Sequence, residues 1–79
     1  MQVEVRVKLK ESVLDPQGEA IRRVLTNLGF EEVEQVRVGK LMLLEVAGDD
    51  AGLVRARVEE AARELLANPV IEDFEVRLP

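Results

Sequence analysis

Hydrophobic and polar residues alternate strictly at the start of the chain. Valine or leucine occupies positions 3, 5, 7 and 9, and a charged side chain occupies positions 4, 6, 8 and 10. A period of two is typical of a strand with one buried face. We therefore expect a strand over residues 2–10, with a polar face that is basic toward its end.

A helix is predicted next. Asp15 and Pro16 fit its N-cap and first position, because a carboxylate accepts unpaired amide hydrogens and proline has none to leave unpaired. Gly29 fits the left-handed residue that ends a helix. Gly18 lowers helix propensity, so it marks either a close backbone approach or a helix that begins one turn later. The apolar stripe of this helix consists of Ile21, Val24, Leu25 and Leu28.

Residues 33–47 read as extended structure, interrupted only by Gly39. Fifteen residues in a straight strand would span about 50 Å, whereas a compact domain of this size is about 30 Å across. The stretch must therefore form a hairpin, bend at Gly39 or reach another copy. Apolar residues occupy even-numbered positions both before and after Gly39, and this unbroken alternation (the apolar parity) favours one long kinked strand. A type II′ hairpin at Gly39 and Lys40 stays open.

A second helix follows the turn at residues 48–50. Asp49 or Asp50 can cap it, and Asn68 with Pro69 stops it. Its apolar positions at helical spacing are Val54, Val58, Ala61, Ala62, Leu65 and Leu66. A last strand is expected over residues 70–78, with Val70, Phe74, Val76 and Leu78 inward.

These elements predict a single domain over residues 1–79 of the α+β class. We expect a small antiparallel or mixed sheet with two amphipathic helices on one face. The opposite face should be polar except for Leu41, Leu43 and Ile71. Apolar side chains on such a face indicate either a partner surface or ordinary scattered exposure.

Composition excludes several function classes. The chain has no cysteine and no histidine, so thiolate metal sites and the commonest general base are missing. The adjacent carboxylate pairs point apart, and no phosphate-binding glycine pattern occurs. The net charge of −5 argues against nucleic acid as a partner. No apolar run suits a membrane span and no signal peptide is evident, so we expect a soluble cytoplasmic protein.

Four segments together resemble the PurS family, the small subunit of phosphoribosylformylglycinamidine synthase. They are Val-Leu-Asp-Pro-Gln-Gly at 13–18, Leu-Gly-Phe at 28–30, Val-Arg-Val-Gly-Lys at 36–40 and Leu-Ala-Asn-Pro-Val-Ile-Glu-Asp-Phe at 66–74. The resemblance covers essentially the whole chain in order and in length.

This resemblance implies an accessory subunit of an ATP-dependent C–N ligase in purine biosynthesis, a glutamine amidotransferase complex. In this family the small subunit supplies no catalytic residue and bridges a large ligase subunit and a glutaminase subunit, helping ammonia to pass between them. It also implies self-association as a dimer or tetramer. No cofactor or metal is expected on this chain, and ATP and Mg²⁺ are implied for the large subunit.

Eight residues of the family-like segments and of the polar sheet face are candidates for a partner interface: Asp15, Gln17, Arg37, Gly39, Lys40, Leu41, Leu43 and Asn68. Capping explains Asp15 and Asn68 equally well, whereas Arg37 and Lys40 lack a structural explanation and are the favoured pair. Two other classes remain open, a regulatory module that binds a small ligand and a plain dimerisation domain.

Overall fold

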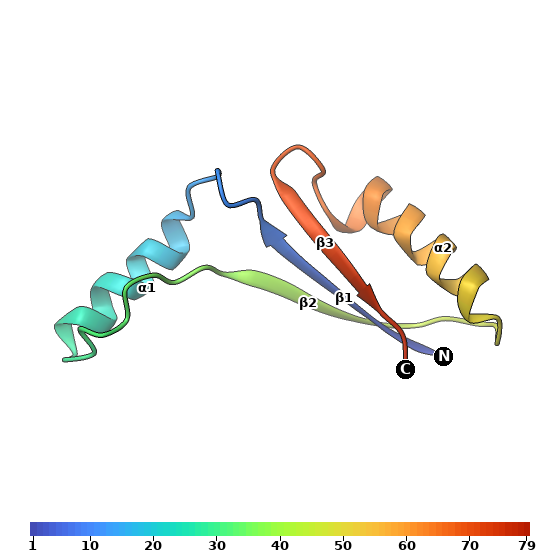
Figure 1. Ribbon diagram of the computed structural model, residues 1–79, viewed down its shortest axis with the longest axis horizontal. Coiled ribbons are helices and arrows are strands. Elements are labelled where there is room, and N and C mark those ends of the chain that lie inside the picture. Colours follow the sequence, from blue (N-terminus) through green and yellow to red (C-terminus); the bar gives the residue numbers. More distant parts are fainter.

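The computed structural model describes residues 1–79 and contains a three-stranded antiparallel sheet of order β2-β1-β3. The elements follow one another as β1 (Gln2–Leu9), α1 (Pro16–Asn27), β2 (Gly39–Glu45), α2 (Ala51–Ala61), η1 (Ala62–Leu66) and β3 (Glu72–Arg77) (Figure 1). The α+β class and the antiparallel sheet are thereby confirmed. Neither helix is long and apolar enough to cross a lipid bilayer.

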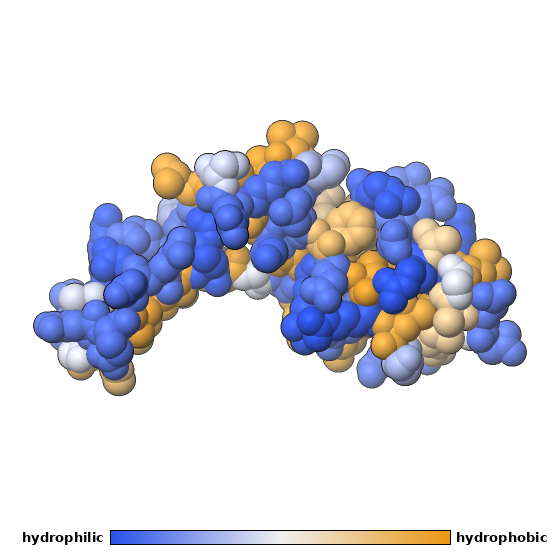
Figure 2. All heavy atoms as spheres, in the orientation of Figure 1, coloured by the Kyte–Doolittle hydropathy of each residue, from blue (hydrophilic) through white to orange (hydrophobic).

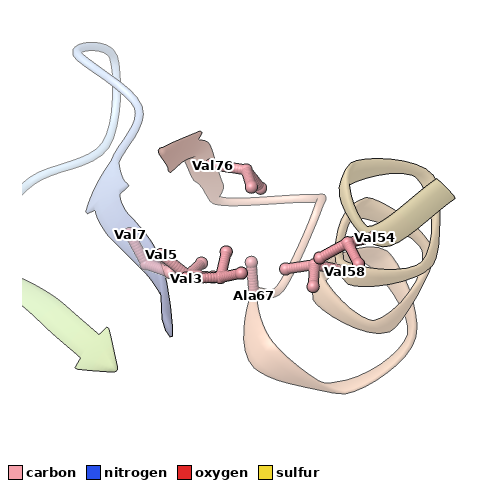
Figure 3. Packing of buried hydrophobic residues seen from close by; sticks show 7 residues of the cluster. All are labelled: Val3, Val5, Val7, Val54, Val58, Ala67 and Val76. Carbon is pink, nitrogen blue, oxygen red and sulfur yellow. The ribbon is translucent and has the colours of Figure 1, made fainter. Parts of the chain in front are cut away.

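The strand register places the apolar positions on one face of the sheet. Val5 lies opposite Met42 on one side and opposite Val76 on the other. Val3, Val5 and Val7 are fully or almost fully buried, and they point at Val54 and Val58 of α2 (Figure 3). The core therefore lies between the sheet and α2.

The second helix differs from its prediction at its end. Asp50 caps it, since its carboxylate accepts a hydrogen bond from the Leu53 amide at 3.1 Å. Its last turn, η1, is a wider π-type turn that leaves Leu65 exposed. Val70, which the sequence placed inward, is exposed in the turn before β3, because β3 begins only at Glu72.

Helix α1 begins and ends as predicted. Asp15 is its N-cap and accepts from the Gly18 amide at 2.9 Å. Gly29 has a positive φ of 99°. The Phe30 amide bonds to the Leu25 carbonyl and the Gly29 amide to the Thr26 carbonyl, the pattern of a Schellman cap.

The predicted position of α1 is wrong. It makes no substantial contact with any other element, so only α2 covers the sheet. Figure 1 shows α1 extending away from the strands, and the chain measures 49 × 25 × 14 Å. The reason is at its first turn, where Asp15 and Gly18 fasten the helix to residues 36–38 and not to the sheet.

Residues 33–47 form neither a hairpin nor one long strand. Only Gly39–Glu45 joins the sheet. The pairing of β2 with β1 ends where Lys8 lies opposite Gly39, because β1 itself ends at Leu9. Residues 33–38 instead run alongside α1 (Figure 1). The parity prediction is confirmed within β2, where Leu41 and Leu43 are exposed and Met42 and Leu44 are half-buried. We call α1 together with residues 28–38 the arm.

Candidate functional site

The arm meets the sheet at a surface groove that contains several of the candidate interface residues. We call it the junction groove, and it is lined by Arg6, Val7, Lys8, Arg37, Val38, Gly39, Lys40, Leu41, Asp73, Phe74 and Glu75. An adjoining hollow includes Asp15 and Gln17 together with Gly39 and Lys40. Six of the eight candidates therefore gather where the end of β1, the start of α1 and the start of β2 come together.

Asp15 ties two of these elements to each other. One carboxylate oxygen, Oδ1, accepts from the Gly18 amide at 2.9 Å, and the other, Oδ2, accepts from the Val38 amide at 2.7 Å. The Val38 amide lowers the pKa of Asp15 most, followed by the Gly18 amide, and the Arg37 charge lowers it further. Asp15 is 9% exposed, and each of its carboxylate oxygens already accepts a hydrogen bond. Its role is therefore to position the arm, and little of its side chain is accessible to a partner protein.

Arg37 and Lys40 are exposed on the rim of the groove. A guanidinium nitrogen of Arg37, Nη2, donates to the Lys10 carbonyl oxygen at 2.9 Å. The Lys40 ammonium lies 3.8 Å from a carboxylate oxygen of Glu72. Arg37 thus has the structural contact that the sequence did not reveal, while the exposed Lys40 holds one long ion pair to the mostly buried Glu72 side chain.

Gly39 and Asn68 have structural explanations. A Cβ atom on Gly39 would lie 2.7 Å from the Val7 carbonyl oxygen, so the close pairing with β1 requires glycine. The Asn68 side chain accepts from the Val70 amide at 3.1 Å, and the Asn68 amide donates to Glu72 at 2.7 Å. Asn68 therefore shapes the turn into β3 and orients the carboxylate that faces Lys40.

Leu41 and Leu43 are the apolar candidates, and they lie on the polar face of the sheet. They are 58% and 60% exposed, beside Arg6 and Glu4 of β1. Leu43 stands apart from the junction groove, toward the other end of β2. Because β2 is an edge strand, these two leucines and its free backbone groups form one continuous surface for contact with another chain.

The sequence also missed a surface on the arm. Ile21, Val24 and Leu28, the stripe assigned to the core, are 39%, 56% and 67% exposed, and Phe30 is half exposed. Figure 2 shows hydrophobic atoms along the lower edge of the arm. The one signal that pointed to this outcome was the excess length of residues 33–47.

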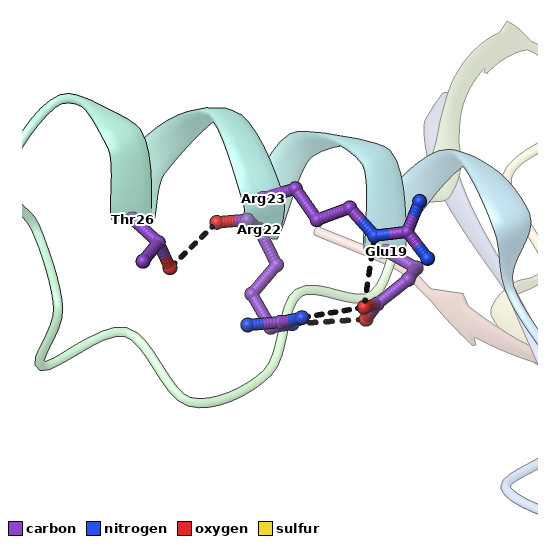
Figure 4. Close-up of polar contacts among 4 residues, drawn as sticks. All are labelled: Glu19, Arg22, Arg23 and Thr26. Atoms are coloured by element: carbon purple, nitrogen blue, oxygen red, sulfur yellow. Dashed lines mark hydrogen bonds and ion pairs between the residues drawn. The ribbon is translucent and has the colours of Figure 1, made fainter.

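The polar face of α1 is satisfied within the helix. Glu19 accepts from Arg22 at two atoms and lies 3.6 Å from Arg23, while the Thr26 hydroxyl donates to the Arg22 carbonyl oxygen at 3.1 Å (Figure 4). The Arg22 hydrogen bond lowers the pKa of Glu19, as the Arg77 hydrogen bond lowers that of Glu75. These carboxylates are paired with neighbours and do not converge, and no three His, Cys, Asp or Glu side chains cluster as metal ligands.

Comparison with known proteins gives one consistent result. The family model named PurS, described as phosphoribosylformylglycinamidine (FGAM) synthase, matches residues 2–79. The chain is 49% identical over 72 residues to the phosphoribosylformylglycinamidine synthase subunit PurS of Bacillus subtilis, covering 91% of this chain and 84% of the relative. It is 42% identical over 74 residues to the same-named subunit of Methanocaldococcus jannaschii, covering 94% and 89%. A chain of the PurLQS structure from Thermotoga maritima aligns with a TM-score of 0.88 at 38% identity, covering 96% and 93%.

Proposed function

This chain belongs to the PurS family, and on that premise we propose that it is the non-catalytic assembly subunit of a phosphoribosylformylglycinamidine synthase. In this role it bridges an ATP-dependent ligase subunit and a glutaminase subunit and assists the passage of ammonia between them. It also associates with further copies of itself. ATP and Mg²⁺ belong to the ligase subunit in this proposal.

The likeness to a chain of the PurLQS structure is the observation that carries the proposal. That likeness extends over 96% of this chain and 93% of the aligned chain, at a TM-score of 0.88. The side-chain geometry supports the non-catalytic part, because the shifted carboxylates Asp15, Glu19 and Glu75 are each paired with neighbours in caps or ion pairs. A free acid or base next to a substrate pocket would have favoured an enzyme instead.

We assign the contact with the other subunits to the junction groove and to Leu41 and Leu43. Lys40 at the rim keeps only a long ion pair, and Arg37 offers further donors besides the one that reaches Lys10. The two leucines supply exposed apolar area next to these charges. A central apolar contact with a charged rim is the usual composition of a protein interface.

The test is assembly of the purified subunits on a sizing column. The ligase and glutaminase subunits are expected to co-elute only when this chain is added. The double variant Arg37→Ala/Lys40→Ala is expected to weaken co-elution at least tenfold while its circular dichroism stays native. Arg57→Ala is the matched control, because Arg57 is an exposed arginine of α2 whose side chain pairs only with Glu60.

Co-elution of the two larger subunits without this chain would contradict the bridging role. Native assembly by the double variant would remove the junction groove from the interface. A double variant that unfolds would show that Arg37 and Lys40 are structural, since Arg37 then contributes mainly through the Lys10 carbonyl.

A further inference from the structure

The junction groove is a positively charged site in an acidic chain. The net charge of the chain is −5, yet the groove is lined by four cations and only two carboxylates: Arg6, Lys8, Arg37, Lys40, Asp73 and Glu75. Both carboxylates already have partners that do not line the groove. The Lys10 ammonium lies 3.4 Å from Asp73, and the Arg77 guanidinium donates to Glu75 at 2.8 Å. The carboxylates of the lining therefore do not neutralise its cations.

Two of the four cations form no ion pair. Arg6 and Lys40 are each paired with a carboxylate outside the lining, at 2.8 and 3.8 Å. The Arg37 guanidinium donates to the Lys10 carbonyl oxygen, which carries no net charge. The Lys8 side chain is exposed and has no polar partner in the chain. Two positive charges, those of Lys8 and Arg37, are thus left without a paired carboxylate.

Gly39 leaves open space beside Lys8. The register places Gly39 opposite Lys8, and a Cβ atom added to Gly39 would lie 3.7 Å from the Lys8 Cβ. Because glycine has no side chain, β2 does not fill the space next to the Lys8 stem. The groove has a volume of about 570 Å³, which is within the range of small-molecule sites. A ligand can therefore lie beside the unpaired ammonium.

Arg37 is held at the same end of the groove. Its guanidinium reaches from the arm to the Lys10 carbonyl oxygen, two residues beyond Lys8 along the chain. This contact uses Nη2, so Nε and Nη1 keep N–H groups for a ligand. A guanidinium that is already held in place loses little conformational entropy when a ligand binds.

Charge and geometry favour a phosphate group over a carboxylate. A phosphomonoester carries nearly two negative charges at pH 7, which matches the two unpaired cations, whereas a carboxylate carries one. The planar guanidinium of Arg37 also suits two phosphate oxygens at once. Leu41 follows Gly39 on the same face of β2 and is 58% exposed, so it offers apolar contact to the rest of a ligand.

We propose that the junction groove binds a small organic phosphomonoester, a phosphorylated sugar or a nucleoside monophosphate. Its phosphate lies between Lys8 and Arg37, and its organic part lies toward Leu41. This inference goes beyond the proposed function, which assigns no small molecule to this chain. Because Arg37 also belongs to the surface assigned to the larger subunits, an occupied groove presents a different charge to them.

Nuclear magnetic resonance titration of the native chain tests the site. Ribose 5-phosphate and adenosine 5′-monophosphate are the probes, at about 0.15 M salt, where distant surface charges are screened. At least one probe is expected to shift the amide signals of Lys8, Gly39 and Leu41 along a saturable curve with a Kd below about 1 mM. Absence of a saturable shift with both probes, or saturable shifts confined to other parts of the chain, would overturn the site.

Lys8→Gln is the test variant. It removes one unpaired charge and is expected to weaken binding by at least about fivefold, because the ammonium no longer attracts the phosphate at contact distance. Arg63→Gln is the control, since Arg63 is exposed in η1, forms no ion pair and gives the same change in net charge. Equal Kd values for the two variants would contradict the site at Lys8.

Two further ligands keep the test decisive if Lys8→Gln unfolds. Ribose, which has no phosphate, is expected to give no saturable shift. Inorganic phosphate is expected to bind at least about fivefold more weakly than the better organic probe, because it lacks the apolar contact with Leu41. Saturable binding of ribose would overturn the role of the phosphate, and equal affinity for inorganic phosphate would overturn the organic ligand.

The two proposals fail separately. A chain that supports co-elution of the larger subunits but shows no saturable shift is an assembly subunit without this ligand site. A chain that binds a probe at Lys8 but does not support co-elution has the ligand site without the assembly role.

Discussion

Gly18 and Asp15 show how two side-chain positions set the direction of a whole helix. Gly18 is buried inside the first turn of α1, and its lack of a Cβ lets the Val36 carbonyl oxygen approach. Asp15 joins the two segments that meet there, because its carboxylate accepts hydrogen bonds from the Gly18 amide and from the Val38 amide. The choice left open by the sequence is thereby settled in favour of a close backbone approach, because α1 already begins at Pro16.

Gly18→Ala is expected to destabilise the chain. The added Cβ would meet the Val36 carbonyl at 2.1 Å, and backbone cannot move aside as a side chain can. We expect a loss of more than about 2 kcal/mol in unfolding free energy, at the upper part of the range for overpacking.

Gly52→Ala is the matched control. Gly52 also lies in the first turn of a helix, but its added Cβ would be 3.5 Å from its nearest neighbour, an oxygen of Asp50. This substitution is expected to stabilise the chain by about 0.5–1 kcal/mol through helix propensity. Denaturant unfolding of both variants measures the contrast, and equal effects would contradict the close approach at Gly18.

At the scale of elements, the attachment of α1 depends on the charge of Asp15. The pKa of Asp15 in the folded chain is lowered from its ordinary value of 3.8, mainly by the Val38 amide. The stabilisation from a carboxylate with a lowered pKa is fully present above the ordinary value and is lost as the pH falls through the folded pKa. The arm should therefore loosen in acid.

Asp15→Asn is expected to reproduce this loosening at neutral pH, because an amide offers one acceptor oxygen where the carboxylate offers two. The variant should melt more than about 4 °C below the native chain at pH 7. The difference in melting temperature should shrink as the pH falls below about 4. The control is Asp50→Asn, which changes the N-cap of α2. Amide hydrogen exchange in α1 should be faster in Asp15→Asn and unchanged in Asp50→Asn. A difference in melting temperature between Asp15→Asn and the native chain that does not vary with pH would contradict the account.

Elements that are determined by neighbouring residues could be predicted from the sequence, whereas those determined by distant contacts could not. Strand β1, both N-caps and the left-handed Gly29 depend on neighbouring residues, so alternation and capping rules identified them. The wide turn at η1 and the exposed Val70 depend on how the chain returns to β3, which no local pattern encodes.

The placement of α1 could not be predicted from its stripe. An amphipathic stripe indicates that a helix packs against an apolar surface. The stripe does not indicate whether that surface belongs to the same chain or to another. Among the interface candidates, Arg37, Gly39 and Asn68 were identified from family-like segments, but their hydrogen bonds to distant backbone became visible only in the structure. The exposed leucines of β2 followed from parity alone.

The whole molecule is too extended for its mass. Seven buried residues form its hydrophobic core cluster, on one side of a three-stranded sheet. A chain this small gains only a few kcal/mol from its own core, and oligomerisation is a usual supplement. Membership in the PurS family and the extended shape therefore agree on a protein that functions within an assembly.

Coupling between glutamine hydrolysis and amidine synthesis tests the central claim most directly. Purified ligase and glutaminase subunits are assayed for product with glutamine and, separately, with ammonium ion, each with and without this chain. We predict that glutamine-dependent synthesis rises at least tenfold when the chain is added, while ammonium-dependent synthesis changes less than twofold. Equal glutamine-dependent rates with and without the chain would contradict the account.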